Sequence, residues 1–259
     1  MRTSDHDAVL DRAFRLLAAF TPDHGELTLA ELAAASDLPR STAHRLAGQL
    51  TEHGALERSA RGWRLGLRLF ELGQLVPRQE RLRELALAHM QDLYELTHET
   101  IQLAVLDGGQ VLYVEILSGH RKVPTPSRRG GRMPVHCTAL GKALLAFAPD
   151  GGAAAVEAAG RLDARTGHTI TDPQRLMSEL HDVRRHAVAY DRQEASLGLR
   201  CVASPVLSTD GTARAALSVS LPAEDPRPFP EVAAAVRMAA LALSRELRSQ
   251  PDGSVLGRR

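Results

Sequence analysis

Residues 130–147 concentrate side chains that could do chemistry in one short stretch near the middle of the chain. Their sequence is GGRMPVHCTALGKALLAF, with His136 beside Cys137 and a Gly141-Lys142 pair shortly after. A thiol and an imidazole together suggest a nucleophile with its base, or two ligands of a metal ion. A glycine followed by a lysine is typical of loops that bind phosphate. Each of these sites requires further residues at fixed positions.

The phosphate loop fails this requirement at both of its ends. The motif needs a glycine, four further residues, and then Gly-Lys followed by serine or threonine. Here Ala143 follows Lys142, and His136 stands where the first glycine is required. We therefore reject a phosphate loop.

The nucleophile and the metal site are also poorly supported. Neighbours in a strand point to opposite faces, so His136 and Cys137 would not act on one another, although a distant partner stays open. A metal ion needs three or four clustered ligands, and beyond this pair the chain offers one more cysteine, Cys201. We expect no catalytic residue, no metal and no cofactor, and we interpret the thiols as small buried groups.

Two other features offer polar groups to a ligand. Thr138 can cap a helix that begins near Ala139, where small residues leave backbone N–H groups accessible to an anion or a carbonyl oxygen. Ser218 and Ser220 stand two apart in a β-rich run and therefore share one face. Either these hydroxyls are buried and hydrogen-bonded, or they face solvent while the alternate residues form the buried face. The spacing fits both alternatives.

Length and composition bound the elements that must position these residues. At 259 residues, 44% hydrophobic and 24% charged, the chain is long enough for two globular domains. No apolar run could cross a bilayer and no signal peptide is visible, so we expect a cytoplasmic protein without membrane contact. The net charge of +1 says nothing about partners, and charge has to be considered by position.

Charge divides sharply within the first 70 residues. Residues 1–37 carry three arginines and seven acidic residues, for a net charge of −4. Residues 38–70 carry six arginines and two glutamates, for a net charge of +4. Such a division within one small domain suggests a face that meets an anion, with a solvated charged surface as the alternative.

The local pattern in this region predicts a helix-turn-helix. Apolar residues at helical spacing indicate a first helix over 9–20. Thr28 and Glu31 form a capping box that starts a second helix. A polar turn at 36–38 separates it from a third helix, which Gly54 ends. The leading end of this third helix would reach base edges in a major groove, or hold phosphates through its hydroxyls. Its residues there are Arg40, Ser41, Thr42, His44 and Arg45.

A small hairpin around Gly62 follows and predicts a wing. Its arginines, Arg58, Arg61 and Arg64, are expected to contact phosphates. Because cap, turn, wing and charge all agree, DNA contact is a better interpretation of this region than a solvated surface.

Three stretches of the chain together resemble one family. They are LAELAAASDLPRSTAHRLAGQLTEHGALERSARGWRLGLRLFELG at 29–73, HCTALGKALLAF at 136–147 and GLRCVASPVLSTDGTARAALSVSLP at 198–222. In this order they are similar to the IclR family of bacterial transcriptional regulators. The resemblance implies a second domain folded like the GAF and PAS sensors, with a small-molecule effector inside it. The residues implied to line that cavity are Ala139, Leu140, Asp191, Cys201, Ser218 and Ser220, although Asp191 could also be an ordinary loop carboxylate.

The predicted fold class is α+β. In the second half, β-rich runs pair as hairpins around the turns at 107–110 and 208–212, and helices pack against them. A winged helix-turn-helix is expected at 6–68, linker helices at 69–96, an effector-binding domain at 83–250, and a disordered tail at 251–259.

These features predict a homodimeric or homotetrameric transcriptional regulator. It would bind a palindromic operator in double-stranded DNA, under the control of a small metabolite, and act on a neighbouring catabolic operon. The linker would carry the signal between the domains. The alternatives are an architectural DNA-binding protein without a ligand and, less favoured, an enzyme that uses cysteine and histidine. The identity of the effector, and whether the protein represses or activates, lie beyond the sequence.

Overall fold

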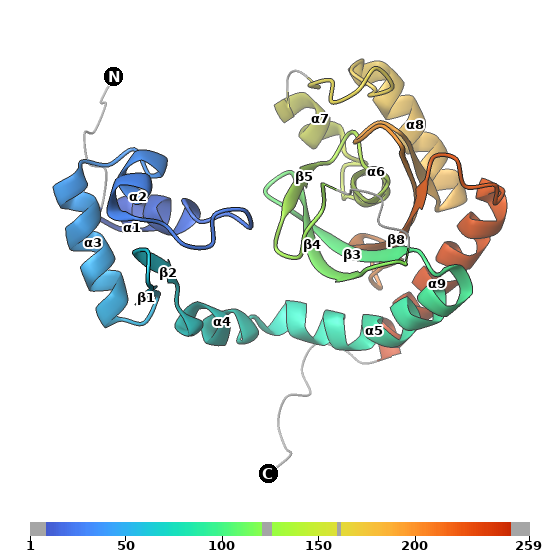
Figure 1. The fold of residues 1–259 in the computed structure, drawn as a ribbon. Coiled ribbons are helices and arrows are strands. Elements are labelled where there is room, and N and C mark those ends of the chain that lie inside the picture. The colour runs from blue at the N-terminus through green and yellow to red at the C-terminus, as the bar shows by residue number, and fades with distance from the viewer. Residues whose placement is uncertain (1–8, 121–125, 160–161, 250–259) are drawn as a thin grey trace, which may run out of the picture. The chain divides into compact units, whose positions relative to one another are not determined.

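The structure is a computed structural model that describes residues 9–120, 126–159 and 162–249 (Figure 1). The chain forms two compact units, Met1–Glu80 and Arg81–Arg259, and the change of unit falls inside one helix, α5 (Pro77–Thr97). The predicted domain boundaries stay predictions. The predicted tail at 251–259 lies outside the described residues.

The N-terminal unit is a winged helix-turn-helix, as the sequence predicts. Three helices precede a two-stranded antiparallel hairpin, and a fourth helix follows it. They are α1 (Val9–Ala18), α2 (Leu29–Ala35), α3 (Arg40–Glu52), β1 (Leu56–Arg58), β2 (Trp63–Leu65) and α4 (Leu67–Gln74). The helices and the hairpin share one apolar core, which includes Leu16, Leu32, Leu46, Leu56 and Trp63.

Local chemistry sets the ends of α2 and α3. The Thr28 hydroxyl accepts the Glu31 N–H at 3.3 Å while the Glu31 carboxylate accepts the Thr28 N–H at 2.7 Å, which confirms the capping box. The turn after α2 places Asp37 in the left-handed region, at φ 50°. The α3 helix begins directly after Pro39, whose restricted φ suits that place. It ends just before Gly54, at φ 72°.

The C-terminal unit is built on one antiparallel sheet of six strands, in the order β5-β4-β3-β8-β7-β6. Hairpins join β3 to β4 and β7 to β8, as predicted. The short edge strands β5 and β6 are absent from the prediction, since three or four residues carry little periodicity. The bounds are β3 (Thr100–Asp107), β4 (Gln110–Leu117), β5 (Arg132–Pro134), β6 (Ala189–Arg192), β7 (Leu199–Leu207) and β8 (Ala213–Pro222).

Helices cover both faces of this sheet (Figure 1). On one face α6 (Ala139–Ala146) contacts β3, β4, β6, β7 and β8, and α8 (Pro173–His186) packs against α6. On the other face lie α5 and α9 (Phe229–Ser249), while α7 (Ala153–Ala159) contacts α8. Two separate apolar cores result, one on each side of the sheet.

The two covered faces decide the question of the serine pair in β8. Ser218 and Ser220 are buried beside α6 residues. The alternate residues of the strand are buried as well, against the α5 and α9 layer. The solvent-facing alternative is therefore wrong, because each side of this strand meets a layer of helices. Those alternate residues are Leu217, Val219 and Leu221.

Candidate DNA-binding surface and effector cavity

The α3 helix turns one face to the core and the other to solvent. Ala43, Leu46 and Ala47 are buried in the N-terminal unit. Of the five predicted DNA-contact residues on α3, four are exposed and the fifth, Thr42, is half-buried. The exposed ones are Arg40, Ser41, His44 and Arg45. The Arg45 guanidinium donates to the Gln49 side chain at 3.2 Å, one turn further along the helix.

The wing arginines make different contacts from one another. Arg58 lies over the Trp63 ring, 3.9 Å from its centroid, and the His44 ring stands nearly perpendicular to the same ring, with 6.1 Å between centroids. Arg61 and Arg64 form exposed ion pairs, with Glu31 at 3.3 Å and with Glu57 at 3.0 Å. Trp63 thus joins the wing to α3. Its role was not predicted, and a lone tryptophan between basic residues was the available signal.

The predicted effector residues converge in the C-terminal unit. All six line a single cavity of about 20 Å³, close to the space of one water molecule. Asp191 lies in β6 and is buried, so the ordinary loop carboxylate is wrong. Thr138, which the sequence predicts at the start of α6, lines the cavity as well, and Ala195 and Leu199 are near neighbours in sequence of predicted residues. The remaining lining residues were not predicted because they come from segments distant in sequence. They are Gln102, Tyr113, Pro126, Ser127 and Met133.

Gln102 organises the hydroxyl groups of this cavity. Its side-chain oxygen accepts from Ser218 at 3.1 Å and from Ser220 at 3.3 Å. Its side-chain nitrogen donates to the Ser127 hydroxyl at 2.7 Å. The Cys201 thiol lies 3.2 Å from the Ser220 hydroxyl. The buried hydroxyl groups of Ser218 and Ser220 therefore share Gln102 as their hydrogen-bond partner, as expected for buried polar groups.

Residues 130–147 contain β5 and the whole of α6, and the start of α6 lines this cavity. The Thr138 hydroxyl accepts the Gly141 N–H at 3.1 Å, so the predicted cap is confirmed. The N–H groups of Ala139 and Leu140 meet no acceptor in the part of the chain that the structure describes. Gly141 is needed for close packing, since a Cβ there would stand 2.2 Å from the Val135 carbonyl oxygen.

Lys142 is fully buried and holds three elements together. Its ammonium group donates to Glu179 of α8 at 2.6 Å and to Glu194, after β6, at 2.7 Å. The Glu194 N–H in turn donates to the Asp191 carboxylate at 2.6 Å. The Gly-Lys pair therefore anchors the cavity wall through buried charge.

Asp191 is the ionisable carboxyl group among the cavity-lining residues of the described chain. Burial raises its pKa to about 7, and the Glu194 carboxylate acts in the same direction. The Glu194 N–H and the Lys142 ammonium oppose that rise without cancelling it. The cavity therefore changes charge near neutral pH.

The adjacent histidine and cysteine do not form a reactive pair. The His136 ring nitrogen lies 3.0 Å from the Asp163 carbonyl oxygen. Burial raises the pKa of Cys137 to about 12, and the Asp191 carboxylate adds to that rise. The thiol is therefore protonated at neutral pH and a poor nucleophile. The residues of 9–120, 126–159 and 162–249 contain no cluster of three metal-ligating side chains.

Both units match known protein families. A model of the IclR helix-turn-helix domain matches residues 9–60, and the model of the C-terminal region of the bacterial transcriptional regulator IclR matches residues 75–245. The chain belongs to the IclR family. It is therefore a helix-turn-helix transcriptional regulator, and the two-part α+β fold predicted from the sequence is confirmed.

Characterised IclR-family relatives resemble this chain over most of their length. The regulator XynR of Escherichia coli K12 is 32% identical over 242 residues, 92% of this chain and 96% of XynR. The acetate operon repressor of Salmonella typhimurium is 31% identical, over 82% of this chain and 79% of that protein.

Solved IclR structures share the fold. An IclR homologue of Microbacterium hydrocarbonoxydans in complex with 4-hydroxybenzoate has a TM-score of 0.86 at 32% identity, over 94% of this chain and all of that one. The IclR of Thermotoga maritima has a TM-score of 0.76 at 29% identity, over 92% of this chain and 98% of that one. None of the helices within the described ranges combines the length and hydrophobicity of a membrane span.

Proposed function

We propose that this regulator binds operator DNA through the exposed start of α3 and the wing, and that a small molecule in the cavity beside α6 controls that binding. The convergence of α6, β6, β7 and β8 on one cavity with polar groups carries the proposal. The 4-hydroxybenzoate complex of the Microbacterium relative supports a small-molecule effector. The regulator acts in the bacterial cytoplasm, on an operon near its own gene, and catalyses no reaction.

The partner at the N-terminal unit is a second copy of the chain. Large apolar side chains are exposed to solvent on α1, on α4 and at the residue that follows α4, where a monomer gains nothing from exposing them. A symmetric pair of these units would present two recognition helices to a palindromic operator. The exposed residues are Val9, Leu10, Phe14, Leu67, Phe70 and Leu75.

The cavity has to open before it can hold an effector. At about 20 Å³ it is far smaller than the roughly 300 Å³ at the lower end of ligand pockets. The bond between Gln102 and Ser127 closes it on the side of residues 126–131, which directly precede β5. An effector that competes for the Gln102 side chain releases Ser127.

Glu115 connects the segment that contains Ser127 to α5, the helix that leads from the N-terminal unit. Its carboxylate in β4 is almost fully buried and bonds both Arg129, two residues after Ser127, and Arg83 of α5. Burial acts to raise the pKa of Glu115, but bonds from Arg83 and the Ile116 N–H outweigh it and lower the pKa. The carboxylate therefore stays charged and ties this segment to α5.

Selection of genomic DNA fragments by the purified protein, followed by footprinting, tests the DNA-binding part of the proposal. A thermal-shift screen of metabolites then identifies the effector, because ligand binding to the native state raises its apparent stability. The effector should change operator affinity in the wild type and in Ser208→Val, a control in the β7–β8 turn. It should not do so in Ser218→Val. If no metabolite changes operator affinity, the architectural alternative is correct.

The route through Glu115 has its own test. Glu115→Gln should retain its affinity for the effector and for the operator. The factor by which the effector changes operator affinity, which measures the coupling, should fall toward one. The matched control Glu224→Gln is exposed and should keep wild-type coupling. Equal coupling in both variants would remove Glu115 from the route without touching the regulator assignment.

A further inference from the structure

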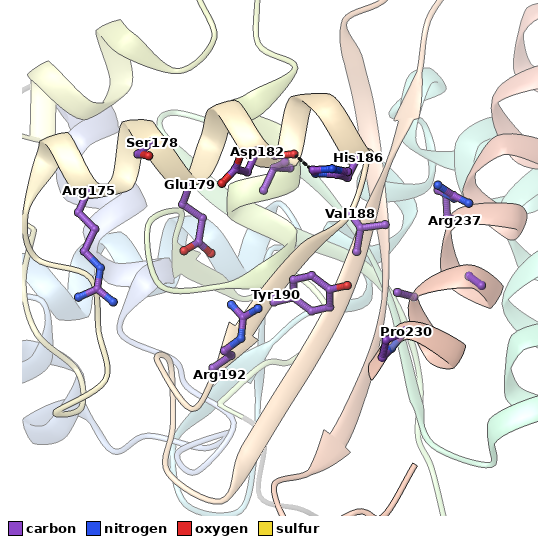
Figure 2. Close-up of a pocket in the computed structure, with 13 residues that line it drawn as sticks. Arg175, Ser178, Glu179, Asp182, His186, Val188, Tyr190, Arg192, Pro230 and Arg237 are labelled. Carbon is purple, nitrogen blue, oxygen red and sulfur yellow. Dashed lines mark hydrogen bonds between the residues drawn. The ribbon is translucent and has the colours of Figure 1, made fainter. Parts of the chain in front are cut away.

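A second hollow of the C-terminal unit lies at the free edge of the sheet. It has a volume of about 620 Å³ and sits over the edge strand β6, between α8 and α9 (Figure 2). Pockets for small organic ligands measure about 300–1,000 Å³. None of the residues predicted for DNA or effector binding lines this groove. Its chemistry therefore needs a separate explanation.

Cationic side chains stand at both ends of the groove. The α8 helix and β6 run in opposite directions, because a tight turn at Ala187, with φ 54°, joins them. Arg175 at the start of α8 and Arg192 at the end of β6 therefore share one end (Figure 2). His186 at the end of α8 and Arg237 of α9 lie toward the other end.

These arginines lack the partners that other arginines of the unit have. Arg83 and Arg129 bind Glu115, and Arg227 binds Asp225 and Glu99. Among the described residues, no carboxylate lies within ion-pair distance of the three arginines of the groove. Like charges that face one concave surface repel each other, and an anion between them would relieve that repulsion.

The acidic residues of the groove do not cancel this charge. The Glu179 carboxylate shares the buried Lys142 ammonium with Glu194, at 2.6 and 2.7 Å, so this cluster leaves one negative charge against the three guanidinium groups. The backbone carbonyl oxygen of Asp182 lies 2.9 Å from the His186 ring nitrogen. The exposed side-chain carboxylate of Asp182 adds one negative charge to a groove with three guanidinium groups. The groove is thus net positive at neutral pH.

Between its ends the groove offers an apolar wall. The Tyr190 ring packs against Phe229, with 5.3 Å between ring centroids, and cannot easily turn away. The Arg192 guanidinium lies 4.7 Å from the centroid of the same ring, which holds it in place. Ala233 and Ala234 of α9 leave the opposite wall open. A ligand with an apolar body therefore fits between the charges.

We propose that this groove binds a small organic carboxylate with an apolar body, at a site separate from the effector cavity. Guanidinium groups bind carboxylates through paired, charge-assisted hydrogen bonds, and a ring between them accepts the apolar part. Arg175 and Arg192 would hold the carboxylate, with Tyr190 against the body of the ligand. Arg237 suits a second acidic group at the far end.

Calorimetric titration of the full chain with benzoate and adipate tests this proposal, with benzamide and adipamide as uncharged controls. Each carboxylate should bind at one groove site per chain, with an affinity that falls as salt rises, and the amides should not bind. The double variant Arg175→Gln/Arg192→Gln should lose at least about tenfold in affinity. Arg185→Gln is the matched control, because Arg185 is exposed on α8 and does not line the groove. It should bind as the wild type does.

Two results would overturn the proposal: neither carboxylate binds the wild type, or the double variant binds as well as the wild type. If the double variant keeps binding while Ser218→Val abolishes it, the carboxylate lies in the effector cavity. If the double variant keeps binding but changes the sedimenting mass, the groove is an interface between copies. All the substituted arginines are exposed, so the variants should fold, and circular dichroism checks this.

Discussion

The recognition surface and the effector cavity are made in opposite ways. One helix, α3, presents the first within residues 40–45, and its polar side chains there are exposed except for the half-buried Thr42. The second draws on segments from Gln102 to Ser220, and its polar groups are buried and bonded to each other. A substitution on the exposed surface removes one contact and leaves its neighbours in place. A substitution in the buried network also deprives the bonded partners of their hydrogen bonds.

Charge pairs show the same contrast. Arg61 with Glu31 is an exposed pair, which contributes little to stability because water and salt screen it. Lys142 and Glu194 form a buried pair. Removal of one partner leaves the charge of the other buried, with neither a counter-charge nor water to solvate it. The largest effects should therefore come from the cavity wall and the smallest from the wing.

Lys142→Met should give the largest effect. It leaves the Glu194 carboxylate buried without its cation, which costs about 3–5 kcal/mol of unfolding free energy. Denaturant unfolding of the C-terminal unit measures the loss. Lys142→Met/Glu194→Gln should recover part of it, since the second change removes the stranded charge. A loss below about 1 kcal/mol would show that the buried Lys142 pair contributes no more to stability than an exposed pair such as Arg61 with Glu31.

Asp191 should make stability depend on pH. Its pKa is raised to about 7 in the folded chain, so between pH 4 and 7 the folded state holds a proton that the unfolded state has released. The stability from this group is therefore present at low pH and is lost as the pH rises through 7. Asp191→Asn should abolish about 2–3 kcal/mol of decline between pH 5 and 8. Parallel pH profiles of the two proteins would contradict a buried, protonated Asp191.

Arg45→Ala should have an intermediate effect on the recognition surface. If Arg45 contacts a base, specific operator binding weakens by about 1–3 kcal/mol while binding to random DNA changes little. Competition binding assays with operator and random duplexes compare the two. Equal losses on both duplexes would make Arg45 a phosphate contact instead.

Arg61→Gln should give the smallest effect. Its exposed pair with Glu31 leaves stability within about 0.5 kcal/mol of the wild type. If Arg61 binds phosphate, the slope of log affinity against log salt falls by about one, on any duplex. An unchanged slope would remove Arg61 from the DNA contacts.

The sequence predicted what depends on neighbours along the chain. The capping box of Thr28 and Glu31, the helix start at Thr138 and the hairpins at 107–110 and 208–212 are local, and the structure contains each of them. The short strand that carries Asp191 was missed, because four residues carry too little periodicity. The spacing in β8 could not choose between buried and solvent-facing serines, because it does not show that two layers of helices bury both faces of the strand.

By itself, then, the sequence determined the helix-turn-helix, its wing and the family, because caps, turns and charge are properties of adjacent residues. Only the tertiary structure decided what Lys142 and Glu115 do, since their partners lie 37 and 52 residues away for the lysine and 32 and 14 for the glutamate. It also decided which side chains share the groove at β6. Burial and charge pairing between distant segments have no local signal, and packing alone brings them together.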